Sequence, residues 1–281
     1  MSHAANCVAC PTGEHRQRVY FSTRDRANRS SIGYVEIDLR DPLHVLDVSP
    51  EPVLTPGPVG GFDDSGVSLA CIIESGGETL LYYTGWNLGL TVPWRNSIGL
   101  AVSGDGLRFE RFSPAPVLDR SRIDPFSISY PFVMPGSETW RMWYGSNLRW
   151  GEAQRDMDHV IKYATGRGPD LWTPTGQICV GIERPDEYAF SRPCVVRDGT
   201  MWRMWYSFRG AAYRIGYAES DDGVRWVRRD HLAGIEPSDR GWDSESVEYP
   251  WVFDHEGKRY MLYNGNRYGL TGFGIAILES D

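Results

Sequence analysis

One aromatic strand pattern recurs five times along this chain, and this repetition constrains the fold more than any other feature of the sequence. The copies are TLLYYTGWN (79–87), TWRMWYGSN (139–147), MWRMWYSFR (201–209), KRYMLYNGN (258–266) and a weaker RVYFSTRD (18–25). A second strand pattern follows each copy, in SIGYVEI (31–37), SIGLAVSGDG (97–106), VIKYATGRG (160–168), RIGYAESDDG (214–223) and FGIAILESD (273–281). Each pair of patterns predicts a β-hairpin.

A third strand pattern precedes four of the hairpins. It reads VSLACII (67–73), ISYPFVM (128–134), FSRPCVV (190–196) and VEYPWVF (247–253). Ala70, Pro131, Pro193 and Pro250 align within it, at intervals of about 60 residues. Because proline cannot donate to a central ladder, the aligned prolines predict an edge strand, such as the innermost strand of a propeller blade. The first repeat is expected to use a degenerate strand around Asn6 to Pro11.

These patterns predict an all-β fold, a single five-bladed β-propeller of four-stranded antiparallel blades. It would form one domain over residues 1–281, with repeats at approximately 5–60, 61–121, 122–184, 185–240 and 241–281. The chain ends after the third strand of the last repeat, so an N-terminal segment is expected to complete the final blade. A β-sandwich is the alternative fold, but it leaves the five aligned units unexplained.

Composition narrows the classes of partner. The formal net charge is −8, from 37 acidic and 29 basic residues, which argues against a nucleic-acid partner because phosphate binding requires a basic surface. No segment approaches ~18 continuous apolar residues, so no membrane partner is expected, and the N-terminus lacks the apolar stretch of a signal peptide. We therefore expect a cytoplasmic protein. The sequence carries no signal for its oligomeric state.

Cysteines and histidines do not predict a metal or another cofactor. The count of 5 cysteines is odd, and Cys71 and Cys194 fall inside apolar strands, where thiols act as small hydrophobic side chains. Cys7 and Cys10 form a C-x-x-C motif, but no second pair of cysteines follows at a zinc-site spacing.

Strand polarity predicts which side chains share one end of the ring. In a four-stranded meander, the start of the first strand and the turn between the second and third strands lie at the same end. Aromatic residues make up 13% of the chain, including 11 Trp and 15 Tyr, an abundance typical of surfaces that stack on flat ligands and also of many short aromatic strands. The candidate site residues at this end are Asp63, Asp64, Trp86, Trp94, Arg95, Asn96, Tyr130, His159, Glu187, Arg192, Glu248 and Tyr249.

A functional residue should break the repeat, whereas a structural one should recur. Two residues before the aligned Ala or Pro, the repeats read Ser68, Ser129, Ser191 and then Glu248. A carboxylate on an inner strand is costly to bury unless it is paired or hydrated, so Glu248 is the strongest catalytic candidate. A salt bridge between Glu248 and Arg192 is the structural alternative.

The motifs P-x-V (131–133), W-R-M-W-Y (140–144) and I-G-Y-A-x-S-x-D-G (215–223) resemble those of the five-bladed propeller glycosidases of families 43, 32 and 130. In family 43 the general acid is a glutamate two residues before such a proline, and this resemblance places it at Glu248. The positions that would carry the other two acidic residues hold serines here, so Asp63 or Asp64 would supply the second carboxylate. The F-D-D-x-G and V-P-x-R-N segments are similar to those of uncharacterised propeller relatives.

Two functions follow. The first is a glycoside-acting enzyme, a hydrolase or glycosyl-transfer enzyme, with Glu248 as proton donor and Asp64 as its partner across the central pocket. Trp86 or Trp94 would stack on the sugar, and Arg192, Asn96 and His159 would bind its polar groups. The alternative is a non-hydrolytic propeller that binds a carbohydrate or another small molecule, or one repurposed in a biosynthetic pathway.

Overall fold

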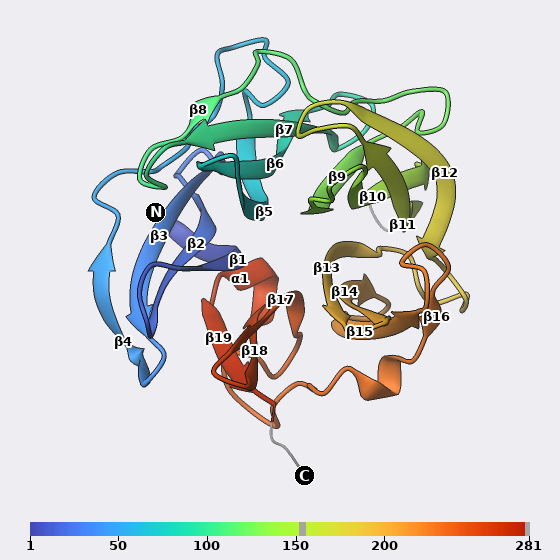
Figure 1. The fold of residues 1–281 in the computed structure, drawn as a ribbon. Coiled ribbons are helices and arrows are strands. Elements are labelled where there is room, and N and C mark those ends of the chain that lie inside the picture. The colour runs from blue at the N-terminus through green and yellow to red at the C-terminus, as the bar shows by residue number, and fades with distance from the viewer. Residues whose placement is uncertain (152–155, 279–281) are drawn as a thin grey trace.

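The computed structural model describes residues 1–151 and 156–278, which form β-sheets arranged radially around a central axis (Figure 1). The first half of the chain forms β1 (Ser2–Pro11), β2 (Arg16–Arg24), β3 (Ser30–Asp38), β4 (Asp41–Val48), β5 (Gly66–Ser75), β6 (Glu78–Leu88), β7 (Trp94–Ser103), β8 (Glu110–Arg111), β9 (Ile128–Met134) and β10 (Trp140–Arg149). The second half forms β11 (Asp158–Gly166), β12 (Trp172–Val180), β13 (Ser191–Asp198), β14 (Met201–Arg209), β15 (Tyr213–Ser220), β16 (Val227–Arg228), β17 (Glu248–His255), β18 (Lys258–Asn264) and β19 (Phe273–Ile277). The helical segments whose bounds lie wholly within the described residues are η2 (Asp230–Leu232) and α1 (Asn266–Gly269).

The strands pair as antiparallel meanders. Two sheets are four-stranded, β12-β11-β10-β9 and β13-β14-β15-β16, and the last sheet has the order β17-β18-β19. The first sheet is eight-stranded, but its halves, β1–β4 and β5–β8, meet at one parallel pair, Ser30 and Gly66. The predicted all-β propeller with four-stranded antiparallel sheets is therefore confirmed. The expected strand 273–281 corresponds to β19, and residues 279–281 lie outside the described residues.

The aligned prolines lie on edge strands, as predicted. β9, β13 and β17 each lie at the end of a sheet, and their ladders shift register at the proline. The residue before each proline has a positive φ, which is 46° for Tyr130, 57° for Arg192 and 60° for Tyr249. A bulge of this kind redirects side chains, so it determines where these three residues point.

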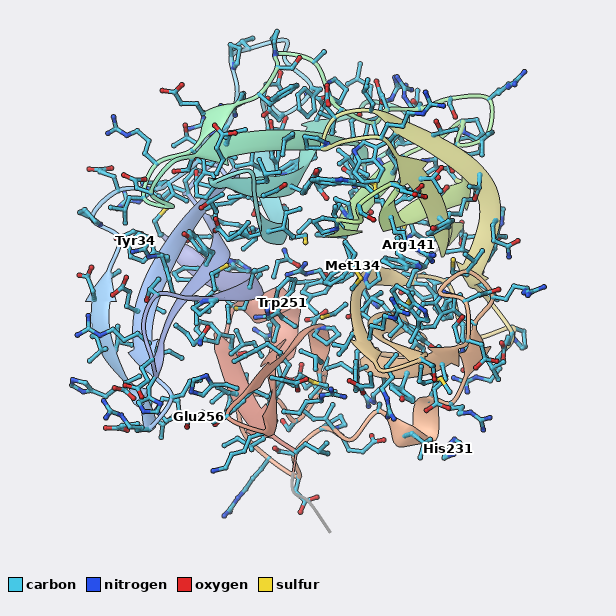
Figure 2. The ribbon with its side chains drawn as sticks, in the orientation of Figure 1. Tyr34, Met134, Arg141, His231, Trp251 and Glu256 are labelled. Atoms are coloured by element: carbon cyan, nitrogen blue, oxygen red, sulfur yellow. The ribbon has the colours of Figure 1, made fainter. Side chains whose placement is uncertain are left out.

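Apolar side chains fill the spaces between neighbouring sheets (Figure 2). Trp143 of β10 packs against Trp202 of the next sheet with 5.8 Å between ring centroids, and its Nε1 donates to the carbonyl of Gly223 at 2.8 Å. Nearer the axis, Phe132 lies 5.7 Å from Trp251. Burial on both faces of each sheet explains why apolar residues occur at both strand parities.

The ring closes differently from the sequence-based prediction. β1 is the inner strand of the first sheet, as expected for the region around Asn6 to Pro11, and among the described residues it adds no strand to the last sheet. The Asn264 side chain joins the two sheets instead, because its Oδ1 accepts the backbone N–H of Asn6 at 2.9 Å and its Nδ2 donates to the Ala4 carbonyl at 2.6 Å. The expectation that the N-terminal segment completes the final blade is wrong. None of the helices in residues 1–151 and 156–278 has the length and apolar character needed to span a membrane.

Candidate functional site

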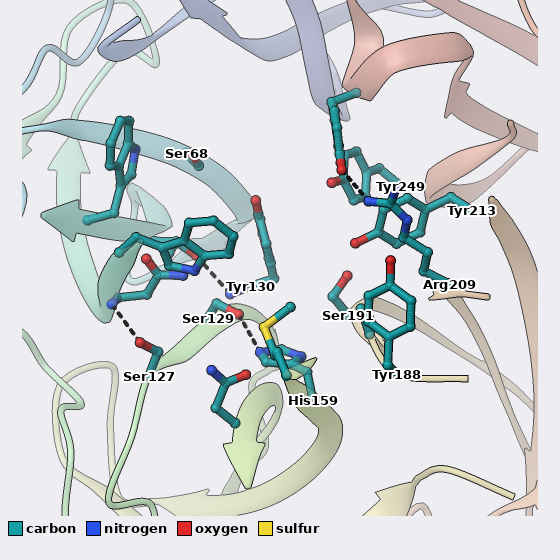
Figure 3. Close-up of a pocket in the computed structure, with 18 of the residues that line it drawn as sticks. Ser68, Ser127, Ser129, Tyr130, His159, Tyr188, Ser191, Arg209, Tyr213 and Tyr249 are labelled. Carbon is teal, nitrogen blue, oxygen red and sulfur yellow. Dashed lines mark hydrogen bonds between the residues drawn. The ribbon is translucent and has the colours of Figure 1, made fainter. Parts of the chain in front are cut away.

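A cavity of about 730 Å³ opens at the end of the ring where the inner strands β9, β13 and β17 begin (Figure 3). Equivalent positions of the repeat build much of its wall. The inner strands contribute Ser68, Ser129 and Ser191. Where each aromatic strand ends, one position contributes Arg24, Trp86, Asn147 and Arg209, and three of the four cross-strand partners, Asn96, His159 and Tyr213, also line the cavity.

One corner of the cavity holds a buried histidine. His159 Nδ1 lies 2.5 Å from the Phe190 carbonyl, which can only accept, so Nε2 is left to accept from the Ser129 hydroxyl at 3.2 Å. Burial lowers the pKa of His159 to about 4. Gly145 makes room for this contact, since a Cβ there would lie 2.3 Å from His159 Cε1. His159 is therefore a neutral hydrogen-bonding group near pH 7.

Amide and indole groups line the adjacent wall. Asn147 is 1% exposed, and neither its Nδ2 nor its Oδ1 has a hydrogen-bond partner among the described residues, nor does Asn96 Oδ1. Trp86 donates its Nε1–H to Ser30 Oγ at 2.8 Å, and Trp94 lies in the same lining. This wall offers unused amide donors and acceptors beside two indoles.

Arg209 lies within a group of tyrosines on the opposite side of the cavity (Figure 3). Its guanidinium lies 5.3 Å from the ring centroid of Tyr213 and 5.8 Å from that of Tyr268, and it donates to the Tyr268 hydroxyl. Tyr249 packs against Tyr213 and stacks on Tyr130 with centroids 6.0 Å apart. The predicted binding residues Tyr130 and Tyr249 thus line this cavity, together with the predicted Trp86, Trp94, Asn96 and His159.

Glu248 lies behind this wall and is not itself among the lining residues. It is 1% exposed, its Oε1 accepts the backbone N–H of Tyr268 at 2.8 Å, and its Oε2 is buried without a partner among the described residues. Burial raises the pKa of Glu248 to about 8, and the charge of Arg209 opposes this only in part. The carboxyl group is therefore protonated at neutral pH.

The other predicted carboxylates lie outside the lining. Asp63 is buried and accepts from the Tyr83 hydroxyl at 3.0 Å and from Arg111 at 2.9 Å. The Asp64 carboxylate accepts a hydrogen bond from Asn87 Nδ2 at 2.7 Å, and this hydrogen bond lowers the pKa of Asp64. Both groups therefore organise the loop before β5, and the prediction that Asp63 or Asp64 faces Glu248 across the pocket is wrong.

Three more predicted site residues also fall elsewhere. Glu187 forms a buried ion pair with Arg228 at 2.7 Å. Arg192 is 1% exposed and donates to the carbonyls of Ala70 and Cys7, so it links β13 to β5 and β1 near the axis and does not pair with Glu248. Arg95 is exposed and does not line the cavity. Glu187 and Arg192 thus have buried partners in other repeats that the alignment did not reveal.

The sequence analysis missed Arg24, Asn147, Arg209, Tyr213 and Tyr268 as site residues. The first three share one repeat position with Trp86, at the end of the aromatic strand. Their different side chains at one position are the signal that could have found them, because the same pattern-breaking criterion identified Glu248. Tyr268 lies in α1, outside the repeat pattern.

Comparison with known proteins by sequence identifies two relatives of this chain. No protein-family model matches the chain. The uncharacterised proteins MT1551 and Rv1502 of Mycobacterium tuberculosis are each 51% identical over 263 residues, covering 94% of this chain and 88% of theirs. Both relatives thus match over nearly the whole of this chain.

Several solved structures share the fold. A thermostable family-43 glycoside hydrolase has a TM-score of 0.74 at 15% identity, covering 100% of this chain and 91% of its own. A Cellvibrio cellulosa α-L-arabinanase in complex with arabinohexaose has a TM-score of 0.69 at 15% identity, covering 99% and 93%. The chain therefore has the β-propeller fold of these hydrolases.

Proposed function

This chain belongs to the same family as MT1551 and Rv1502 of Mycobacterium tuberculosis, and we propose that it is a single-domain, five-bladed propeller that acts on a glycosidic bond of a carbohydrate bound in the axial cavity. The blades are β1–β4, β5–β8, β9–β12, β13–β16 and β17–β19. The sequence repeats support this count, as does the single residue pair that joins the halves of the eight-stranded sheet.

The unpartnered amides in the cavity wall carry the proposal. Asn147 and Asn96 present buried polar atoms without partners among the described residues, and such atoms are costly unless a ligand or water satisfies them. Trp86 and Trp94 lie beside them. A sugar offers hydroxyls to amides and C–H faces to indoles, so this wall suits a saccharide. The fold shared with the family-43 hydrolase and the arabinanase supports the same ligand class.

Glu248 is the proposed proton donor. A general acid must hold its proton near neutral pH, and burial provides this condition. Because Glu248 does not line the cavity, its action requires Tyr268 to move off Oε1 when the ligand binds. Arg267 and Tyr268 both have a φ of 59°, an unfavourable conformation for residues other than glycine, which lowers the cost of such a rearrangement.

The charge of the cavity favours an anionic saccharide. No Asp or Glu occurs among its lining residues in the described part of the chain, although the whole chain carries a net charge of −8. The lining does contain Arg24 and Arg209, and within residues 1–151 and 156–278 neither forms an ion pair. A neutral Glu248 leaves the charge of Arg209 uncompensated. A carboxylate or phosphate group on the sugar would supply the missing negative charge.

A binding function without hydrolysis is the second candidate. Hydrolysis of this type generally uses two carboxyl groups, whereas the cavity has Glu248 behind its wall and no second carboxylate in its described lining. On this alternative, the propeller would hold a saccharide without cleaving it.

A two-step screen distinguishes the candidates. Neutral saccharides, uronic acids, sugar phosphates and nucleotide sugars are first tested for a shift in melting temperature, and each ligand found is then assayed for turnover. An enzyme turns over at least one of them, and Glu248→Gln strongly reduces turnover while keeping binding. Binding without turnover of any ligand would favour the second candidate, and no binding of any saccharide class would contradict both.

A further inference from the structure

Two histidines and a glutamate from opposite ends of the chain meet where the first and last sheets lie next to each other. His15 precedes β2, His255 ends β17, and Glu256 lies in the β17–β18 turn, at the boundary between the blue and red sheets (Figure 2). His15 Nδ1 lies 3.3 Å from His255 Nε2 and 3.6 Å from Glu256 Oε1, and His255 Nε2 lies 3.8 Å from Glu256 Oε2.

The two separations from His15 Nδ1 match the edges of a metal coordination tetrahedron, and the 3.8 Å between His255 Nε2 and Glu256 Oε2 is slightly longer. Zinc binds imidazole nitrogen at about 2.0–2.1 Å and carboxylate oxygen at about 2.0–2.2 Å, which places neighbouring ligand atoms roughly 3.3–3.6 Å apart. We propose that His15 Nδ1, His255 Nε2 and the Glu256 carboxylate bind a divalent transition metal ion, with zinc as the reference ion and water as the fourth ligand. Imidazole ligands favour zinc, copper or nickel over magnesium or calcium.

A bound metal ion would replace the hydrogen bond between the two imidazoles. At 3.3 Å the two imidazoles form a hydrogen bond, which requires a proton on one of the two facing nitrogens. An ion bound to both facing nitrogens would require that proton to move to the other nitrogen of the same ring, because a metal binds the unprotonated nitrogen of a neutral imidazole.

The metal site would link the first and last sheets of the ring and so stabilise its closure. The last sheet has three strands among the described residues, and hydrogen bonds such as that of Asn6 with Asn264 join it to the first sheet. An ion bound by both His15 and His255 would link the first and last sheets directly. The two histidines are 240 residues apart in the sequence. The inner strands β9, β13 and β17 begin at the cavity, whereas His255 is the last residue of β17. The metal site therefore lies at the end of β17 that is away from the cavity.

The β17–β18 turn supports a role for Glu256. Glu256 has a φ of 48° and is followed by Gly257 at 73°. The equivalent β5–β6 turn uses Gly76 and Gly77 at 64° and 83°, as expected for positions that favour glycine. A glutamate therefore occupies a conformation that suits glycine better, and its carboxylate is placed beside both imidazoles.

Calorimetric titration of zinc chloride into the chelator-treated full chain tests the proposal. We expect one ion per chain, and at about 100 times the dissociation constant a rise in melting temperature of roughly 5–10 °C. Glu256→Gln and His255→Gln should each weaken binding at least ~10-fold, while His44→Gln, a control at an exposed histidine in β4, should not.

Glu256 is 59% exposed, so Glu256→Gln should fold normally, and its melting temperature without metal checks this. Cobalt(II) should give the visible absorption of a four-coordinate ion with the parent and not with His255→Gln. Absence of zinc binding, or binding that both variants leave unchanged, would overturn the proposal.

Discussion

Tyr268 donates its backbone N–H to Glu248 Oε1 at 2.8 Å, and the same residue lines the cavity and hydrogen-bonds to Arg209 through its hydroxyl. α1 therefore connects the burial of Glu248 to the wall that would meet a ligand. A ligand that draws Tyr268 toward Arg209 or away from it changes the environment of the carboxyl group directly. The behaviour of Glu248 is thus the most direct test of the proposed function.

Glu248→Gln preserves the shape of the side chain and removes its acidic proton. Turnover of a saccharide with a poor leaving group should fall by roughly 10²–10⁴-fold, while the dissociation constant changes little. In the parent, turnover should also decline as the pH rises through about 8, where Glu248 loses its proton. Steady-state rates between pH 5 and pH 9.5 would show both effects.

Asp64→Asn serves as the comparison, because Asp64 lies outside the described lining and its carboxylate accepts hydrogen bonds from Gly60 of its own loop and from Asn87 of β6. It should leave turnover within a few-fold of the parent. A Glu248→Gln variant as active as the parent, or an Asp64→Asn variant as inactive as Glu248→Gln, would contradict the assignment.

Burial of Glu248 also predicts how stability depends on pH. Its pKa rises from 4.5 to about 8 on folding, so between these values the folded chain holds a proton that the unfolded chain has released. The free energy of unfolding should therefore fall as the pH rises from about 4.5 to about 8. His159 affects stability at lower pH. Its pKa falls from 6.5 to about 4 on folding, so the free energy of unfolding should decrease as the pH drops through that range.

Urea denaturation of Glu248→Gln at pH 5, 7 and 8.5 measures how much of the pH dependence of stability comes from Glu248. The variant should show a smaller loss of stability toward pH 8.5 than the parent, whereas Glu245→Gln, a substitution at an exposed site nearby, should follow the parent. Parallel curves for Glu248→Gln and the parent would show that the carboxyl group is not buried in solution.

Arg209 predicts a preference for negatively charged saccharides. Arg209→Gln should weaken binding of such a ligand at least ~10-fold, because hydrogen bonds to charged groups contribute about 1.5–3 kcal/mol. A neutral saccharide of the same scaffold should lose little affinity. Titrations with a uronic acid and with a sugar phosphate, each at low and high salt, would identify which anionic group is preferred. Arg122→Gln, at an exposed position, is the control. Equal affinity of the parent for neutral and anionic ligands would refute the preference.

Gly145→Ala tests the packing that creates the His159 corner. The new Cβ would lie 2.3 Å from His159 Cε1 and 2.9 Å from Ser129 Oγ, so the imidazole must move. Overpacking of this kind costs about 1–3 kcal/mol, and the displaced ring should also weaken saccharide binding. Gly104→Ala is the matched control, because no atom lies within 4 Å of its added Cβ. Chemical denaturation and ligand titration of both variants should separate them clearly, and similar behaviour would contradict the geometry.

The sequence alone determined the strands, their pairing into hairpins and the all-β propeller. These features depend on local patterns, namely aromatic runs, turn residues and the aligned prolines, that act within one repeat. Pro131 illustrates this, since its inability to donate a hydrogen bond predicts an edge strand in any context, and β9 is one. The same alignment predicted six lining residues, Trp86, Trp94, Asn96, Tyr130, His159 and Tyr249.

Only the tertiary structure decided which polar groups face the cavity and which satisfy partners in neighbouring sheets. Arg192 and Tyr249 occupy the same repeat position with similar φ, yet Arg192 donates to the carbonyls of Ala70 and Cys7 while Tyr249 lines the cavity. Glu187 pairs with Arg228 for a similar reason, since a buried charge requires a partner wherever the chain brings one within reach. Such partners lie in other repeats, so their proximity is a property of the closed ring and not of any local pattern.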